Sequence, residues 1–305
     1  MTPVLRFAPS PNGPLHLGHA LSALTGYEMA KSCEGRFLLR IEDIDVARTR
    51  EAHVEGIFRD LSWLGVHWEK PVWRQSTRFG AYRDAANRLR DAGLLYPCFA
   101  NRSQINAMAD RVNCRRDPDG APLFDGELRS KVEREASSRF ARGEPHAQRL
   151  DMARAMALAS QRLGAAQLTA THILPSGRVE TKPASPQLWG DAVMVRKDTP
   201  ASYHLAVVVD DAAQGVTHVT RGQDLLAATD LHRLLQVLLE LPEPTYHHHT
   251  LIVRPDGQKL SKSAGDLSLA ELRASGLTAE AVKSAIRVAP PRIATSTQYG
   301  HFHLK

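Results

Sequence analysis

Residues 5–45 combine a strand, a helix and a second strand, and this succession constrains the fold more than any other feature of the chain. The apolar run at 5–8 predicts a strand, a helix is expected from His16 to Gly35, and the run at 37–41 predicts a buried strand. Two parallel strands need a crossover connection of this kind, which is usually a helix. We therefore expect a parallel sheet.

Two short strings contain residues that suit phosphate binding. HLGH spans residues 16–19, and KLSKS spans residues 259–263, about 240 residues later. A helix that begins near His16 presents free N–H groups and the positive end of its dipole, and Gly18 lets a ligand approach closely. Lysines in a loop flanked by glycine and serine can reach phosphates as point charges. Taken alone, HLGH is also explained as two surface histidines on a helix, and KLSKS as an ordinary basic loop.

The rest of the chain continues the alternation of helices and strands. We expect further helices at 49–65, 77–93, 128–142, 224–240 and 268–288, the last as a helical pair. We expect further strands at 203–210, 216–219 and 249–253. An alanine-rich run within 150–190 predicts one more helix, and Asp224 is a candidate N-cap or first-turn acid.

These elements predict a doubly wound α/β core with an insertion. We expect four segments: 1–97 as the first half of the core, 98–190 as an inserted subdomain, 191–250 as the second half, and 251–305 as the KxSKS loop and C-terminal helices. Such a core binds its ligand at the carboxyl ends of its strands. Residues that fall at or beyond such ends are 6–10, His16, Glu42, Tyr203 and Arg221. This convergence predicts the functional site.

HxGH and KxSKS, in this order and at this distance, resemble the signature pair of the class I aminoacyl-tRNA synthetases. The resemblance implies a Rossmann-like nucleotide-binding core, an inserted subdomain like an acceptor-binding one, and ATP with Mg²⁺. It implies that His16, Gly18, His19 and Lys262 bind ATP, and that His16, His19, Lys259 and Lys262 are catalytic. Donors of this kind suit the reaction, because attack on the α-phosphorus spreads negative charge over the phosphate oxygens.

Longer stretches resemble the glutamyl and glutaminyl branch of this family. RFAPSPNGPLHLGH at 6–19, LLRIED at 38–43, and AVVVDD at 206–211 with TRG at 220–222 carry the resemblance, which covers roughly residues 4–100 and 190–265. It implies that glutamate is held by Arg6, Phe7, Ala8, Pro9, Ser10, Glu42, Tyr203 and Arg221. An arginine fork can clamp the side-chain carboxylate, and Glu42 can pair with the α-ammonium group. Taken singly, Arg6 or Glu42 is equally explained by a surface salt bridge, and Tyr203 by packing.

The chain is similar in length, order and motif spacing to the short members of this branch, the glutamyl-Q tRNA(Asp) synthetases. About 40 residues follow KxSKS, which is too short for an anticodon-binding domain. The resemblance implies tRNA-independent activation of L-glutamate and its transfer to queuosine in the anticodon of tRNA(Asp). The 39 Lys and Arg exceed the 33 Asp and Glu by 6, and a pI near 9.4 suits a polyanion such as RNA.

The cysteines and the N-terminus indicate the compartment. Three scattered cysteines are too few for a disulfide framework and fit a reducing cytosol. The N-terminus lacks the shape of a signal peptide, and no apolar run approaches the length of a membrane span. We expect a cytoplasmic protein without a membrane partner, and a monomer.

Zinc is not expected. Many members of the branch bind zinc through a C-x-C pair and a later Y-x₃-C, and the matching positions here hold Cys98, Ala100, Phe124 and Leu128. Structural zinc needs four N, S or O donors, so apolar packing is expected to replace it. The histidines at 247–249 could also bind metal, but neighbours on a strand point to opposite faces.

Other functions remain open from sequence. One is a truncated glutamyl-tRNA synthetase that charges the tRNA 3′ end, and another is a non-catalytic RNA-binding paralogue. Intact His16, His19 and Lys262 argue against the second. Small-molecule nucleotidyltransferases also use HxGH, but the expected glutamate residues and KxSKS argue against that class.

Overall fold

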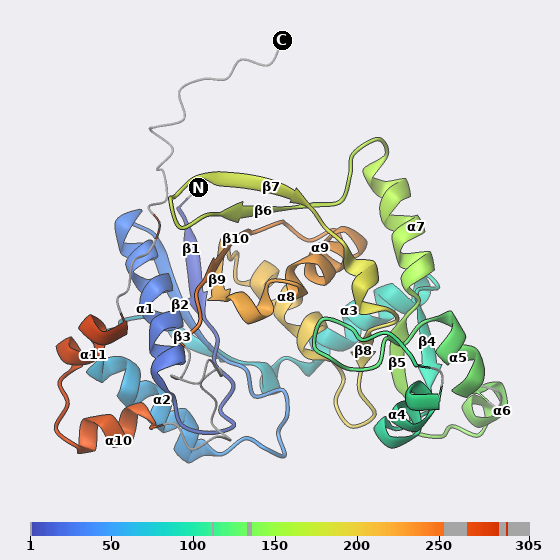
Figure 1. Ribbon diagram of the computed structural model, residues 1–305, viewed down its shortest axis with the longest axis horizontal. Coiled ribbons are helices and arrows are strands. Elements are labelled where there is room, and N and C mark those ends of the chain that lie inside the picture. Colours follow the sequence, from blue (N-terminus) through green and yellow to red (C-terminus); the bar gives the residue numbers. More distant parts are fainter. Residues whose placement is uncertain (1, 112, 133–135, 253–266, 287–290, 292–305) are drawn as a thin grey trace, which may run out of the picture.

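The computed structural model describes residues 2–111, 113–132, 136–252, 267–286 and 291, and a seven-stranded sheet forms its centre (Figure 1). The strand order is β3 (Glu69–Arg74), β2 (Arg36–Ile41), β1 (Val4–Phe7), β9 (His218–Gly222), β10 (Thr245–His249), β6 (Thr169–Ile173) and β7 (Val179–Pro183). All neighbours are parallel except β6 and β7, which are antiparallel. The chain winds outward on both sides of β1, so the doubly wound α/β prediction is confirmed.

The first half of the sheet follows the expected strand–helix–strand pattern. Leu5 of β1 lies opposite Phe37 of β2, and α1 (Leu17–Ser32) connects the two strands. α1 packs on β1, β2 and β9, and buries residues such as Leu24 and Met29. α2 (Glu51–Trp63) then leads to β3, as expected.

The second half places a histidine-rich strand inside the sheet. β10 pairs with β9 so that His248 lies opposite Arg221, and α9 (Ala228–Leu238) connects these strands. Nδ1 of His247 lies 2.9 Å from the carbonyl oxygen of Ile173, and Nδ1 of His249 lies 2.9 Å from that of Thr250. Because these imidazoles have hydrogen-bond partners, a polar strand can be buried here.

A smaller antiparallel sheet lies beside the core, in the order β4 (Leu95–Cys98), β5 (Ala147–Leu150) and β8 (Val193–Val195). α3 (Phe79–Asp91) precedes β4, and the helices that follow β4 up to β6 are α4 (Arg102–Arg111), α5 (Gly126–Val132), α6 (Ala136–Ala141) and α7 (Met152–Leu163). Figure 1 shows α4, α5 and α6 gathered near the small sheet, at the opposite end of the molecule from α1.

The two sheets do not follow the boundaries expected at residues 98 and 190. β6 and β7 lie within 98–190 but belong to the large sheet. β8 follows residue 190 but belongs to the small sheet. The four-segment division stays a prediction, and the hydrogen bonding of the inserted region is shared between both sheets.

The strand expected at 203–210 is wrong, because these residues belong to α8 (Tyr203–Ala213). Leu205, Val207 and Val208 are all buried, and α8 packs against α3 and α9. A continuous apolar run suits a buried helix and a buried strand equally well. Tertiary packing here outweighs the preference of valine for strands.

Other boundaries also shift. The strand expected at 249–253 is wrong, because β10 ends at His249, and Ile252 packs against the core without belonging to a strand. β9 begins at 218 and not at 216. The helix expected from 224 begins at Ala228, and Asp224 lies in the short 3₁₀ helix Gln223–Leu225 before it.

The C-terminal helices form the expected pair, α10 (Leu269–Ala274) and α11 (Ala279–Ile286). α10 packs on α2, where Arg273 donates to Asp60 at 2.8 Å, and α11 packs on α1. In the part of the chain that the structure describes, no helix has the length and apolar character needed to cross a membrane.

Candidate active site

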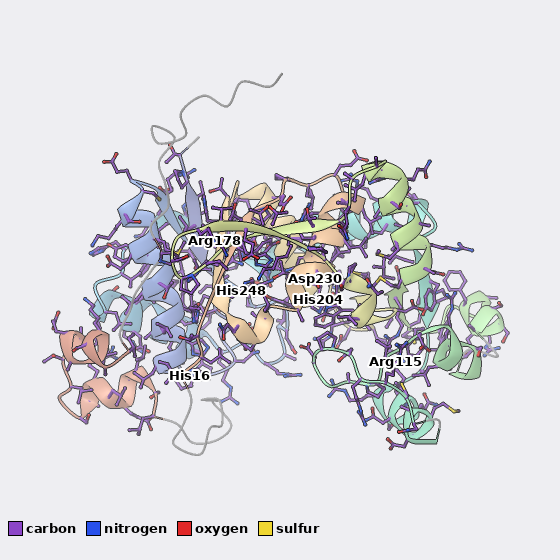
Figure 2. All side chains as sticks on the ribbon, turned by 45° about the horizontal axis from the view of Figure 1, so that its top comes forward. His16, Arg115, Arg178, His204, Asp230 and His248 are labelled. Atoms are coloured by element: carbon purple, nitrogen blue, oxygen red, sulfur yellow. The ribbon has the colours of Figure 1, made fainter. Side chains whose placement is uncertain are left out.

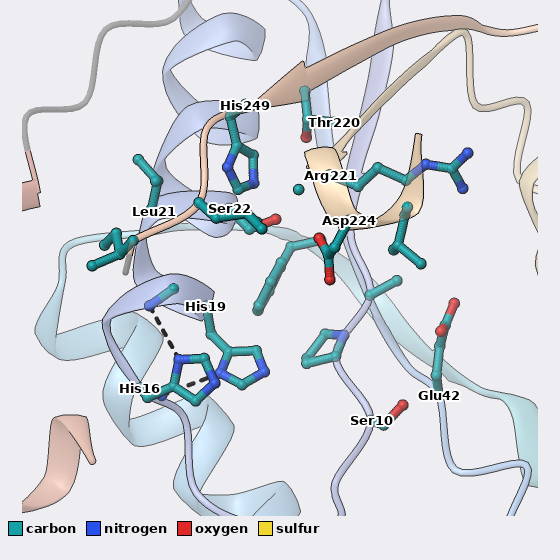
Figure 3. A pocket seen from close by; sticks show the side chains of 18 of the residues that line it. Ser10, His16, His19, Leu21, Ser22, Glu42, Thr220, Arg221, Asp224 and His249 are labelled. Atoms are coloured by element: carbon teal, nitrogen blue, oxygen red, sulfur yellow. Dashed lines mark hydrogen bonds between the residues drawn. The ribbon is translucent and has the colours of Figure 1, made fainter. Parts of the chain in front are cut away.

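A pocket of about 520 Å³ opens at the carboxyl ends of β1, β2, β9 and β10 (Figure 3). Its lining includes these residues expected from sequence: Arg6, Phe7, Ala8, Pro9, Ser10, His16, Gly18, His19, Glu42, Tyr203 and Arg221. Figure 3 shows His16 and His19 at one side of the pocket and Glu42 and Arg221 at the other. The parallel topology brings these distant segments together, because strand ends meet at one edge.

The histidine side of the pocket is the N-terminus of α1. His16 is the N-cap, and its Nδ1 accepts from the backbone N–H of Gly18 at 3.1 Å. Nδ1 of His19 accepts from the backbone N–H of His16 at 3.2 Å. These reciprocal bonds hold both imidazoles at a helix end whose dipole favours anions.

Gly18 has a second reason to be glycine. A Cβ at this position would lie 3.0 Å from Cε1 of His16. The absent side chain therefore leaves room for the capping imidazole as well as for a ligand. The sequence indicated only the second reason.

The opposite side rests on a buried cluster of charges. Arg6 donates to both carboxylate oxygens of Asp211, at 3.0 and 3.3 Å. Arg40 is fully buried, and its Nη1 lies 2.8 Å from Asp211 while its Nη2 lies 3.1 Å from Oε1 of Glu42. Burial alone would raise the pKa of Asp211, but Arg6 and Arg40 outweigh burial and the pKa is lowered.

Glu42, like Arg6, reaches the pocket wall from this cluster. Burial raises its pKa, against the opposing effect of Arg40 and Arg6. A buried carboxylate held in place by arginine is suited to a cationic ligand group, since the ligand relieves the cost of burial.

Arg221 is surrounded by neutral groups. It is 4% exposed, and its Nη2 donates to the hydroxyl of Thr229 at 2.7 Å. Its Nη1 donates to Nδ1 of His232 at 3.1 Å, and its Nε donates to Nε2 of His248 at 3.2 Å. Among the residues that the structure describes, no carboxylate forms an ion pair with Arg221. An anionic ligand group is the natural partner of this cation.

Tyr203 reaches the same pocket from the first residue of α8. Its ring lies 5.7 Å from that of His232, and burial raises the pKa of its hydroxyl. Tyr203 was expected near the end of a strand. The structure places it at the start of a helix, but it still lines the pocket.

Lys259 and Lys262 lie outside the described residues, so their expected role stays a prediction. Described residues on either side of the KxSKS string lie beside the pocket. Ile252 lines it, and the backbone N–H of Leu269 donates to the carbonyl oxygen of Leu15 at 2.8 Å, next to His16.

Sequence reasoning missed several residues of the site. Arg40 had a detectable signal, because a charge inside the apolar run 37–41 requires a buried counter-charge. Asp224 and His249 also line the pocket. Nε2 of His249 is buried and has no hydrogen-bond partner among the described residues.

The positions that match the zinc ligands of the branch lie in a different environment. Cys98, Phe124 and Leu128 share one buried apolar cluster, and Ala100 packs against it. Arg149 covers this cluster, with its guanidinium carbon 3.9 Å from the centre of the Phe124 ring. Among the described residues, no group of three or more His, Cys, Asp or Glu could hold a metal ion.

Comparison with known proteins gives a consistent set of relatives. Residues 4–290 match the family described as tRNA synthetases class I (E and Q), catalytic domain. The chain is 44% identical to the glutamyl-Q tRNA(Asp) synthetase of Rhodobacter capsulatus, over 90% of this chain and 95% of that protein. It is 37% identical to the glutamate–tRNA ligase of a Synechococcus species, over 91% of this chain but 56% of that protein.

The fold is also similar to solved structures. The crystal structure of the glutamate-tRNA synthetase from Elizabethkingia anophelis matches with a TM-score of 0.69 and 27% identity, over 87% of this chain and 53% of that one.

Proposed function

Because the chain belongs to the catalytic-domain family of class I tRNA synthetases for glutamate and glutamine, we propose that it activates L-glutamate with ATP, without tRNA, and transfers it to queuosine in the anticodon of tRNA(Asp). One observation carries the first part: a single pocket joins an anchored anion, Glu42, and an unpaired cation, Arg221, to a helix N-terminus. A free amino acid with an acidic side chain complements the two charges, and a triphosphate complements the helix end.

The activation step assigns a role to each side of the pocket. Arg221 binds the side-chain carboxylate of glutamate, and Glu42 binds its α-ammonium group. The α-carboxylate is thereby directed toward the helix end at His16 and His19. One of its oxygens attacks the α-phosphorus of ATP, the bond to the bridging oxygen breaks, and pyrophosphate leaves with glutamyl-adenylate as the other product.

Stabilisation of the phosphates comes from the histidine side. His16, Gly18 and His19 bind ATP, and Lys259 and Lys262 act on the charge that develops on the phosphates. Mg²⁺ neutralises part of the triphosphate charge when it is bound, and it typically uses ATP phosphates and water with few protein ligands. The described residues fit this requirement, because Asp224 places a carboxylate on the pocket wall.

The transfer step needs a hydroxyl acceptor. A hydroxyl oxygen of the queuosine group attacks the acyl carbon of glutamyl-adenylate, the acyl–phosphate bond breaks, and AMP leaves, while the hydroxyl proton passes to the departing phosphate or to water. The similarity to a protein named glutamyl-Q tRNA(Asp) synthetase, of which this chain covers 95%, supports this acceptor. We propose that the enzyme works in the cytoplasm as a monomer, with RNA and no membrane as its partner.

Two assays test the proposal. Glutamate-dependent ATP–pyrophosphate exchange without tRNA tests activation. Transfer of labelled glutamate to tRNA(Asp) with and without queuosine, beside tRNA(Glu), tests the acceptor. Exchange that requires tRNA(Glu), with labelling of its 3′ end, would favour the 3′-end charging enzyme. No exchange under either condition would favour an RNA-binding protein without catalysis.

A further inference from the structure

We propose that His232 positions Arg221 and keeps its charge uncompensated, which makes His232 a specificity-determining residue for glutamate over glutamine. The inference rests on the proposed function, because it takes Arg221 as the partner of the substrate side chain. His232 lies on α9 behind the pocket wall and is 2% exposed. Figure 2 shows its neighbours His204 and His248 near the middle of the view, away from His16.

The directions of the hydrogen bonds require a neutral imidazole at His232. A guanidinium can only donate, so Nδ1 of His232, 3.1 Å from Nη1 of Arg221, accepts and carries no proton. The ring proton is therefore on Nε2, which donates to Nδ1 of His204 at 3.2 Å. His248 accepts from Nε of Arg221 in the same manner. Three neutral rings thus surround or support one cation.

The surroundings favour these neutral forms. Burial, and then the charge of Arg221, lower the pKa of His204 to about 4 and that of His248 to about 2. The pKa of His232 is lowered by the same causes, and the groups that face it are Arg221, His204, Arg6 and His248. All four of these groups are basic, and Tyr203, whose ring lies 5.7 Å from that of His232, is neutral, so no described carboxylate among these neighbours offsets the charge of Arg221.

This arrangement leaves Arg221 ready for an anion. A guanidinium has five N–H donors, and the contacts with Thr229, His232 and His248 use three of them. The remaining two can bind a carboxylate with a full opposite charge. A glutamine amide has one acceptor oxygen and no charge, so it gains less from the same donors. An acidic side chain at position 232 would remove this advantage, because it would neutralise Arg221 before the substrate arrives.

A pair of variants that differ in charge tests the proposal. His232→Asn and His232→Asp both offer an oxygen close to the position of Nδ1, and only the second adds a negative charge. The measurement is the dissociation constant of stable sulfamoyl analogues of glutamyl-adenylate and glutaminyl-adenylate, by calorimetry. We expect His232→Asn to keep the preference for the glutamyl analogue, and His232→Asp to reduce it by about 30-fold or more, as expected for loss of a buried charge partner.

Controls separate this role from a general effect on folding. His247→Asn removes another buried imidazole, which contacts the Ile173 carbonyl and makes no contact with Arg221, and it should leave the preference unchanged. If His232→Asp does not fold, His248→Asp makes the same test from β10. Melting temperatures and the affinity for ATP are measured for every variant.

The outcomes distinguish the inference from the function it rests on. Equal preference ratios in the Asn and Asp variants would overturn the role of His232, while the glutamate function stands. A wild-type protein without preference for the glutamyl analogue would overturn the proposed function, and the inference with it.

Discussion

Arg6 and Arg221 line the same pocket and are equally buried, with 5% and 4% of their surface exposed, but their partners differ in charge. Arg6 binds both oxygens of Asp211. Arg221 binds Thr229, His232 and other neutral acceptors. The first cation is compensated by a carboxylate, and the second has no carboxylate partner among the residues that the structure describes.

The difference separates a cation that is paired within the protein from one whose described partners are all neutral. Arg40, next to Arg6, is also compensated, by Asp211 and Glu42. A buried ion pair is costly to break because the remaining charge is unpaired. The charge of a buried cation with neutral acceptors is not neutralised, so it can attract an anionic ligand group in the pocket. We therefore expect changes at the first site to affect folding most, and changes at the second to affect ligand binding most.

The largest expected effect is on stability, at Asp211. Asp211→Ala removes the partner that Arg6 and Arg40 share, and leaves excess positive charge in a buried cluster. We expect the free energy of unfolding to fall by about 3–5 kcal/mol, measured by urea denaturation. Glu69→Ala is the control, because it breaks an exposed ion pair with Arg36 of 2.7 Å and should cost about 1 kcal/mol or less. Equal small losses in both variants would contradict the structural role of the Asp211 cluster.

The next effect is on binding, at Arg221. Arg221→Ala should weaken glutamate use by about 2–5 kcal/mol, because the substrate carboxylate loses its charged partner. The KM for ATP should change little, and stability should fall less than in Asp211→Ala, because the partners of Arg221 are neutral. Pyrophosphate exchange at varied glutamate and ATP concentrations measures both values.

Arg221→Lys refines this test. Lysine keeps the charge but loses the planar fork. An intermediate KM for glutamate is expected, between those of the wild type and the alanine variant. An unchanged KM for glutamate in Arg221→Ala would exclude Arg221 from the binding site. The neutral partners of Arg221 would then not indicate a role in binding that Arg6 lacks.

The sequence predicted the meeting of the site residues because parallel strands end at one edge. Arg6, Glu42 and Arg221 each lie at or just after the end of a strand. The ends of these strands can be predicted from the local pattern of apolar residues. The same reasoning failed at α8, because its apolar run is buried all round and has no period that separates helix from strand.

The partners of these residues were harder to predict. Asp211 pairs with Arg6 across 205 positions of sequence, and this contact depends on how α8 packs against the sheet. His232 reaches Arg221 only because α9 turns one face toward β9. These contacts of Arg6 and Arg221 depend on how the helices pack against the sheet, which local sequence patterns do not predict. The charge of Arg40 within a buried run was the one local signal of a hidden counter-charge.

The third prediction concerns pH, at the neutral site. In the unfolded chain a histidine binds a proton near pH 6.5, whereas the pKa of His204 in the folded protein is about 4. Between these values the unfolded state binds more protons, so stability is full above pH 6.5 and falls as the pH drops toward 4. Each such histidine contributes a slope of about 1.4 kcal/mol per pH unit.

A difference measurement isolates this effect. Buried carboxyl groups with raised pKa, such as Glu42, act in the opposite direction, so wild type is compared with His204→Gln. Between pH 7 and 5 the wild type should lose about 1–2 kcal/mol more than the variant, in urea denaturation at each pH. The lowered pKa of Asp211 acts only below its ordinary value of 3.8, so Asp211 does not contribute in this window. Parallel pH curves for the two proteins would show that His204 is not held neutral.

The smallest expected effect is that of metal removal, and it concerns Arg149, whose partners, like those of Arg221, are neutral. Arg149 donates to the Asp191 carbonyl oxygen at 2.7 Å, and its Nε lies 3.4 Å from the sulfur of Cys98. Its guanidinium stacks on Phe124, so it covers an apolar cluster where the branch commonly places zinc. Only Cys98 among the matching positions has a donor, and structural zinc needs four.

We therefore predict that treatment with a zinc-selective chelator, followed by assay with Mg²⁺ present, leaves the melting temperature and the activity unchanged, and that elemental analysis finds no stoichiometric zinc. Cys98→Ala is the matched variant: removal of a buried thiol from an apolar cluster costs packing, and added zinc should change the stability of the variant and the wild type equally. Arg149 then belongs with the structural arginines although its partners are neutral, because it covers a cluster and does not face the substrate pocket. About one zinc per chain, lost together with stability on chelation, would contradict this prediction. It would show that Cys98 binds zinc together with further donors such as Cys114, next to an arginine whose partners are neutral.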